Sequence, residues 1–139
     1  MATAARIFGI PRWRWLPALA YLALIHGLSS LSGDEMPIAP PGGLDKLAHL
    51  CEFAFLAALL WWPARARPGG PARAGGPVWP EMKAAAWIFA FVGLNGIADE
   101  IHQLFVPGRF ASAGDAAADI LGGALALAWL LHREKARVY

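Results

Sequence analysis

Hydrophobic residues fill four long stretches of the chain, at about residues 13–31, 45–62, 84–105 and 111–132. Each is close to the ~20 residues that a helix needs to cross the hydrocarbon core of a bilayer. Apolar residues recur in them at the helical period rather than alternating as in a barrel strand. The pattern predicts an all-α membrane protein, a bundle of four transmembrane helices forming one domain over residues 13–132.

Polar connections separate the stretches and set the expected organisation. Residues 1–12 and 133–139 are predicted tails, and residues 63–83, rich in Pro, Gly and Arg, are predicted to be a flexible loop. Residues 106–109 form a predicted tight turn between the third and fourth helices. Pro107 ends the preceding helix there, and Gly108 permits an unusual backbone angle.

The distribution of charge indicates orientation. The chain is 58% hydrophobic and only 16% charged, which separates it from typical soluble domains. Of its 12 Lys and Arg residues, all but Lys46 and Arg109 fall in the tails, in the second loop or at its edge. The positive-inside rule then places both termini in the cytoplasm, and this placement argues against nucleic acid as a partner. The tryptophans cluster near the span ends and are interpreted as an interfacial belt: Trp13, Trp15, Trp61, Trp62, Trp79, Trp87 and Trp129.

The N-terminus has a second interpretation. Its basic start, the apolar residues 16–28 and the small residues 29–33 also resemble a cleavable signal peptide. Cleavage would leave an odd number of spans and a charge bias that is harder to explain, so we expect the first span to be retained.

Polar side chains form stripes on three of the predicted helices. At ~1.5 Å rise per residue, Glu52, Asp99 and Asp119 in these stripes lie roughly 9–12 Å below the outer ends of their spans. Ionisable groups at membrane depth usually face the bundle interior. We therefore expect the stripes to meet in the outer half of the bundle, with Gly93, Gly122 and Gly123 allowing close helix approach. The stripes are Asp45, His49 and Glu52; Asn95, Asp99, His102 and Gln103; and Asp115 with Asp119.

The expected cluster is strongly acidic. Six carboxyl groups, including Glu100, face two fixed cations, Lys46 and Arg109. Six ionised acids could not gather at low dielectric, so some must be protonated, paired, hydrated or bound to a cation.

The combined spacing resembles the VanZ-like family of small bacterial membrane proteins. The matching residues are Ser29-Ser30, Asp45-Lys46-x-x-His49-x-x-x-Phe53, Asp99-Glu100-x-x-Gln103-x-Phe105-x-Pro107-Gly108-Arg109, Asp115 and Gly122. The resemblance implies a multi-pass protein of the bacterial cytoplasmic membrane. It also implies a link to resistance against the glycopeptide teicoplanin, the trait associated with the founding member. Many members carry Asn where this chain has Asp119.

Several side chains are candidates for chemistry. Glu100, His49 and Asp45 are the candidate catalytic groups, because a carboxylate-held imidazole can act as a general base. His49 with Asp45 could instead bind a metal or form a buried hydrogen-bonded pair. Glu100 is expected to face the outer cavity with Gln103 or to bridge helices. The candidate binding residues are Arg109, Gln103, Asp115, Asp99, Lys46 and Asp119.

The expected partners of these groups remain open in part. Asp99 is expected to pair with Lys46 or Arg109. Arg109 could clamp a phosphate or carboxylate, or could lock its turn by pairing Asp115 or Asp45. Asp115 near a helix start also suits the helix dipole.

The sequence assigns no metal and no cofactor. It has no HExxH or paired-cysteine motif for zinc, although Mg²⁺ or Ca²⁺ would suit Asp45, Glu100 and Asp115. The single cysteine, Cys51, is expected to be buried, and His26 is expected to be a hydrogen bonder inside the bundle.

Three functions remain open at this stage. The first is binding or protection of an envelope lipid, a cell-wall precursor or a glycopeptide. The second is an enzyme that acts on such a substrate by acid–base chemistry, for which no nucleophile stands out. The third is a proton- or cation-coupled transporter, which four helices without a repeat or a broken span disfavour.

Overall fold

A computed structural model describes residues 6–7, 10–35, 44–65 and 81–136. A two-residue hairpin, β1 (Arg6–Ile7) with β2 (Ile10–Pro11), precedes a 3-10 turn, η1 (Arg12–Trp15). Four helices follow: α1 (Leu16–Ser29), α2 (Leu44–Ala64), α3 (Glu81–Gln103) and α4 (Ala113–Ala136). The predicted all-helical bundle is thus confirmed.

Three of these helices, α2, α3 and α4, are long and apolar enough to cross a bilayer. The first helix, α1, has 14 residues and falls short of that length. Together with η1 it covers roughly 29 Å, at about 1.5 Å per α-helical and 2.0 Å per 3-10 residue. The expected first span therefore appears as two consecutive segments rather than one helix.

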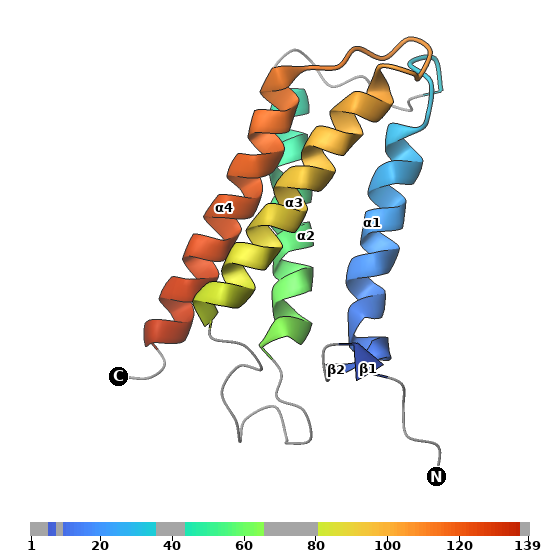
Figure 1. Cartoon of the computed structure of the whole chain (residues 1–139). Coiled ribbons are helices and arrows are strands. Elements are labelled where there is room, and N and C mark those ends of the chain that lie inside the picture. Colours follow the sequence, from blue (N-terminus) through green and yellow to red (C-terminus); the bar gives the residue numbers. More distant parts are fainter. Residues whose placement is uncertain (1–5, 8–9, 36–43, 66–80, 137–139) are drawn as a thin grey trace.

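The helices run alternately up and down (Figure 1). α2, α3 and α4 pack against one another, and α1 lies beside α2 and α3 on the side away from α4. The end of the bundle at which α1 ends and α4 begins is called here the site end. The opposite end, where α1 begins and α4 ends, is called the basic end.

An apolar core extends from the middle of the bundle toward the basic end. Phe53, Leu56 and Val92 are fully buried there, and Ile25 joins α1 to the same core. Trp61, near the end of α2, is also buried, at 2% exposure, and packs in this core. Trp79 lies outside the described residues.

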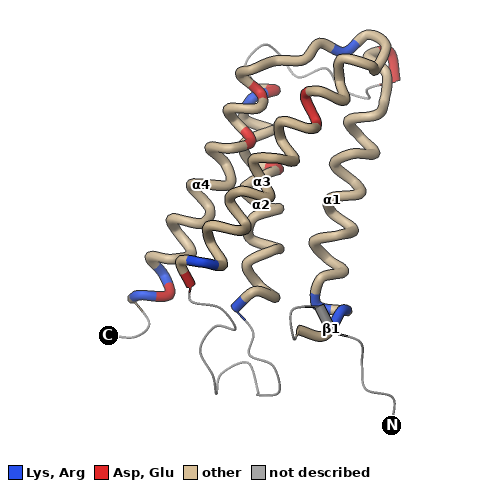
Figure 2. Tube along the Cα trace, in the orientation of Figure 1, with Lys and Arg blue, Asp and Glu red and all other residues tan. Residues whose placement is uncertain are grey.

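Charge divides along the bundle axis (Figure 2). Most described Lys and Arg residues lie at the basic end, and most Asp and Glu residues lie toward the site end. At the basic end, Arg14 stacks over Trp62, 4.7 Å from the ring centroid, and Arg65 pairs with Glu134 at 2.6 Å. Arg67, Arg73 and Arg137, which contributed to the predicted orientation, lie outside the described residues.

Candidate functional site

Glycines bring α2, α3 and α4 close together at the site end. A Cβ on Gly122 would overlap the carbonyl oxygen of Leu50, and one on Gly123 would lie 2.7 Å from Val92 Cγ1. These two close approaches were predicted. Gly93 is under no such constraint, whereas a Cβ on Gly96, which the sequence did not single out, would lie 2.7 Å from Asp119 Cβ. Small residues of this kind let membrane helices pack backbone against backbone.

The close α2–α4 packing joins His49 to Asp119. His49 Nδ1 lies 3.0 Å from Asp119 Oδ1, and Asp119 is completely buried. The expected pairing of His49 with Asp45 was wrong. Asp45 shares a helix face with His49, but the imidazole ring is hydrogen-bonded to the buried Asp119 carboxylate of α4.

Lys46 sits between two carboxylates. Its ammonium donates to Asp115 Oδ1 at 2.7 Å and to Asp45 Oδ2 at 3.5 Å. Among the described residues, neither Lys46 nor Arg109 forms an ion pair with Asp99, so that expected pairing was wrong. Two of the ligands suggested for Mg²⁺ or Ca²⁺, Asp45 and Asp115, are thus already paired with a cation, the Lys46 ammonium.

Asp99 instead connects α3 to α1. Gln103 Nε2 donates to Asp99 Oδ2 at 3.0 Å, and His26 Nδ1 lies 3.6 Å from Asp99 Oδ1. Gln103 also donates to Ser29 Oγ at 3.3 Å. His26 contacts Asn95 as well, so it is a hydrogen bonder between α1 and α3, although its side chain is only partly buried. Ser29 is a site residue whose only signal in the sequence was its place in the family motif.

Glu100 faces the start of α4. Its Oε2 accepts a hydrogen bond from the backbone N–H of Ser112, which precedes that helix. The side chain is buried, at 7% exposure, and it does not line the cavity described next. The expectation that Glu100 and Gln103 share the cavity was therefore wrong for Glu100.

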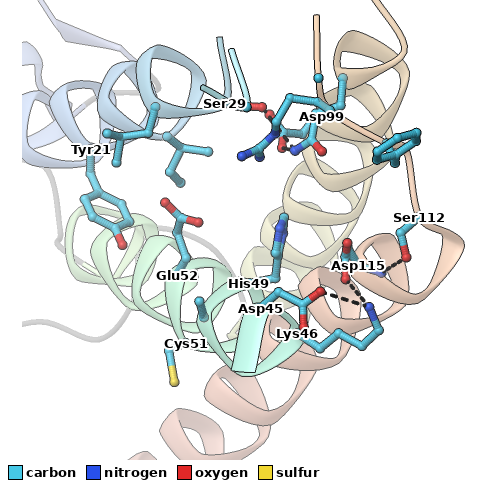
Figure 3. A pocket seen from close by; sticks show the side chains of 18 residues that line it. Tyr21, Ser29, Asp45, Lys46, His49, Cys51, Glu52, Asp99, Ser112 and Asp115 are labelled. Carbon is cyan, nitrogen blue, oxygen red and sulfur yellow. Dashed lines mark hydrogen bonds and ion pairs between the residues drawn. The ribbon is translucent and has the colours of Figure 1, made fainter. Parts of the chain in front are cut away.

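A cavity of about 860 Å³ opens at the site end (Figure 3). Its polar wall comes from α2, α3 and the turn before α4, and includes His49, Glu52, Asp99, Gln103 and Arg109. On the α1 side the lining is mostly apolar, with Tyr21, Ile25 and Leu28. The cavity thus combines charged side chains with apolar side chains suited to hydrocarbon.

Cys51 is exposed and lies on the cavity lining, so the expectation of a buried thiol was wrong. Its position follows from the helical period: the α2 residues that face the core are Phe53, Leu56 and Ala57.

Arg109 reaches the cavity from a tight turn. Gly108 adopts φ +72°, as the Pro-Gly sequence predicted, and Gly33 N–H donates to the Pro107 carbonyl at 3.0 Å. These contacts fix the turn against the end of α1. Arg109 lines the cavity and forms no ion pair with any described carboxylate, so neither proposed pairing partner, Asp115 or Asp45, holds it.

A helical bundle with three bilayer-length helices and a charged cavity at one end defines a polytopic membrane protein. Residues 8–132 match the model of the VanZ/LLP1 family, and the chain belongs to that family. No curated protein and no solved structure matches the chain.

Proposed function

We propose that this protein binds the anionic head group of an envelope lipid or lipid-linked wall precursor in its site-end cavity. One observation carries the proposal: Arg109 lines the same cavity as the apolar side chains of α1 and has no described carboxylate partner. A guanidinium without an acidic partner is suited to phosphate or carboxylate. Ile25 and Leu28 would contact the hydrocarbon part of the same molecule.

The proposed location is the bacterial cytoplasmic membrane, with both termini inside and the site end facing outward. The gathering of basic residues at the opposite end supports this orientation (Figure 2). Four spans follow if η1 and α1 together cross the bilayer. A ligand would then enter from the outer leaflet or from the extracytoplasmic surface.

Binding is tested with the purified full chain in detergent, by native mass spectrometry with added phosphatidylglycerol or phosphatidylcholine. We expect retention of the anionic lipid, and at least tenfold weaker retention by Arg109→Gln. This is the loss of one charge-assisted hydrogen bond, about 1.5–3 kcal/mol. Arg12→Gln, at the basic end, is the matched control. Equal retention of both lipids, or by both Arg variants, would contradict the proposal.

Protection against teicoplanin would follow if the bound molecule is a wall precursor or the antibiotic itself. A sensitive host is given the parent, Arg109→Gln or Glu100→Gln at matched membrane levels, and its susceptibility is measured. Protection by the parent and not by Arg109→Gln supports the cavity as the cause. No protection by the parent would separate the cavity from resistance.

An enzyme is the second candidate function, and the His49–Asp119 pair favours it. An imidazole held by a carboxylate at 3.0 Å on the cavity wall is placed to act as a general base toward a bound substrate. His49→Gln would then abolish turnover of a lipid-linked substrate and leave its binding within a few-fold of the parent. If binding and protection are unaffected by His49→Gln, catalysis through His49 is excluded.

A coupled transporter is less well supported. The fully buried Phe53, Leu56 and Val92 lie between the polar cavity and the basic end, where a transport path would need polar groups or water.

A further inference from the structure

Three buried carboxyl groups at the site end have no fixed cation beside them. Asp99, Glu100 and Asp119 are 2%, 7% and 0% exposed. Among the described residues no Lys or Arg pairs with any of them. The nearby Lys46 pairs instead with Asp115 and Asp45. Buried carboxylates without a compensating charge are strongly unfavourable, so either protons or a bound cation must balance this cluster.

Each of these carboxylates also has an oxygen without a hydrogen-bond partner in the described part of the chain. They are Asp99 Oδ1, Glu100 Oε1 and Asp119 Oδ2, all from side chains more than nine-tenths buried. The other oxygen of each is engaged, by Gln103, by the Ser112 N–H and by His49 respectively. A native fold rarely leaves such atoms unsatisfied. A bound ion is one explanation for unpartnered oxygens that lie beside other metal-ligating atoms.

His49, Asp99 and Glu100 converge from α2 and α3. One nitrogen of His49 and one carboxylate oxygen from each acid lie within 4.8 Å of one another. Because Asp119 accepts at Nδ1 of His49, the Nε2 lone pair is the one available to a ligand. Imidazole supported by a carboxylate in this way is a recurring arrangement in metal sites.

We propose that His49, Asp99 and Glu100 bind a divalent transition-metal ion, with Asp119 orienting His49. One nitrogen and two carboxylate donors fit Zn²⁺ or Mn²⁺ better than Mg²⁺ or Ca²⁺, which prefer oxygen alone. Ligand atoms about 2.0–2.2 Å from such an ion lie at most about 4.4 Å apart. Small side-chain rotations would therefore close the site.

The ion would lie at the floor of the cavity, because His49 and Asp99 line it. With three protein ligands it would keep at least one position for water or for a bound anion. Such an ion balances two of the three buried negative charges. The inference goes beyond the proposed lipid binding, because metal binding requires no lipid.

The test uses the full chain purified in detergent and treated with a chelator. Co²⁺, a spectroscopic substitute for Zn²⁺, is titrated while its visible absorption is recorded, and Mn²⁺ is titrated with detection of the free ion by electron paramagnetic resonance. Zn²⁺ content is measured by elemental analysis after dialysis. We expect one ion per chain, and a thermal midpoint that rises with metal concentration.

The variants keep side-chain size and remove one ligand at a time. Glu100→Gln and Asp99→Asn should each weaken binding at least tenfold, and Asp119→Asn should weaken it less. Glu52→Gln removes an acid from the same cavity that is outside the metal cluster, and should bind within about threefold of the parent. Helicity measured on each variant, with two independent ligand variants, distinguishes loss of the site from loss of the fold.

Two outcomes would overturn the inference. One is no stoichiometric binding of Co²⁺, Mn²⁺ or Zn²⁺ by the parent at neutral pH, which would mean that protons balance the cluster. The other is binding that Glu100→Gln and Asp99→Asn leave unchanged. Retention of phosphatidylglycerol after chelation distinguishes the two proposals, because lipid binding by the metal-free protein tests the cavity alone.

Discussion

His49 of α2 and Asp119 of α4 are joined across the helix interface, with Nδ1 and Oδ1 3.0 Å apart. The carboxylate is completely buried, and the ring is mostly buried with an edge on the cavity. The pair links the packing of the two helices to the cavity, because His49 lines the cavity and Asp119 lies behind it.

Removing the acceptor at residue 119 should destabilise the protein. Asp119→Ala leaves the His49 N–H without a partner in a buried place, which costs about 1–3 kcal/mol of unfolding free energy. Asp119→Asn keeps a carbonyl oxygen at the same position and removes a buried charge, so we expect a change below about 1 kcal/mol. Unfolding in mixed detergent micelles, followed by helicity, measures both. Equal destabilisation by Asn and Ala would show that the carboxylate charge, rather than the hydrogen bond, stabilises the interface.

Enlarging Gly122 should separate α2 from α4. A methyl group there would overlap the Leu50 carbonyl oxygen, which belongs to the backbone and cannot rotate away. We expect Gly122→Ala to lower the unfolding free energy by about 1–3 kcal/mol, as for other overpacked positions.

Gly27→Ala is the matched control for that substitution. Gly27 lies within α1 and has nothing within 4 Å of a Cβ. The substitution should be neutral or should stabilise by at most about 1 kcal/mol, because Ala is the better helix former. Both variants are compared in the same micelle assay. A Gly122→Ala protein as stable as Gly27→Ala would mean that α2 and α4 adjust without loss of packing.

Much of this arrangement could be predicted from the sequence. The helical period and the length of each apolar stretch indicated the helices, and the same period placed His49, Asp99 and Asp119 on inward faces. Partners could not be predicted, because a face does not specify how far two helices are rotated or shifted against each other. Gly122 sets that shift for α2 and α4, and thereby brings His49 to Asp119 and Lys46 to Asp115.

The turn after α1 should respond to acid. Glu35 Oε2 accepts from the Ser32 N–H at 3.0 Å and from the Ser32 hydroxyl at 2.8 Å, which lowers the pKa of Glu35 below its ordinary value. A lowered folded-state pKa means that the contact is fully present above about pH 4.3 and is lost as the pH falls through the lowered pKa. The Ser32 amide resonance, followed by NMR from pH 7 downward, should shift in that window.

Glu35→Gln is the control for the acid response. It removes the titrating group, so the Ser32 amide should lose the transition below pH 4.3. A transition of unchanged size in Glu35→Gln would assign it to another group and would contradict the contact as its cause.

The proposed orientation predicts which end of the bundle a reagent outside the cell can reach. In a Cys51→Ala background, single cysteines replace Phe110 at the site end and Lys135 at the basic end, where both side chains are exposed. A membrane-impermeant maleimide added to intact cells should label Phe110→Cys and not Lys135→Cys. Permeabilised cells should show labelling of both, which controls for the reactivity of each thiol.

The reverse pattern would place the cavity in the cytoplasm and exclude an outer-leaflet ligand. Labelling of neither cysteine in intact cells and both after permeabilisation would mean that the turn carrying Arg109 is shielded from the outer surface, and the cavity would then be reached only through the bilayer.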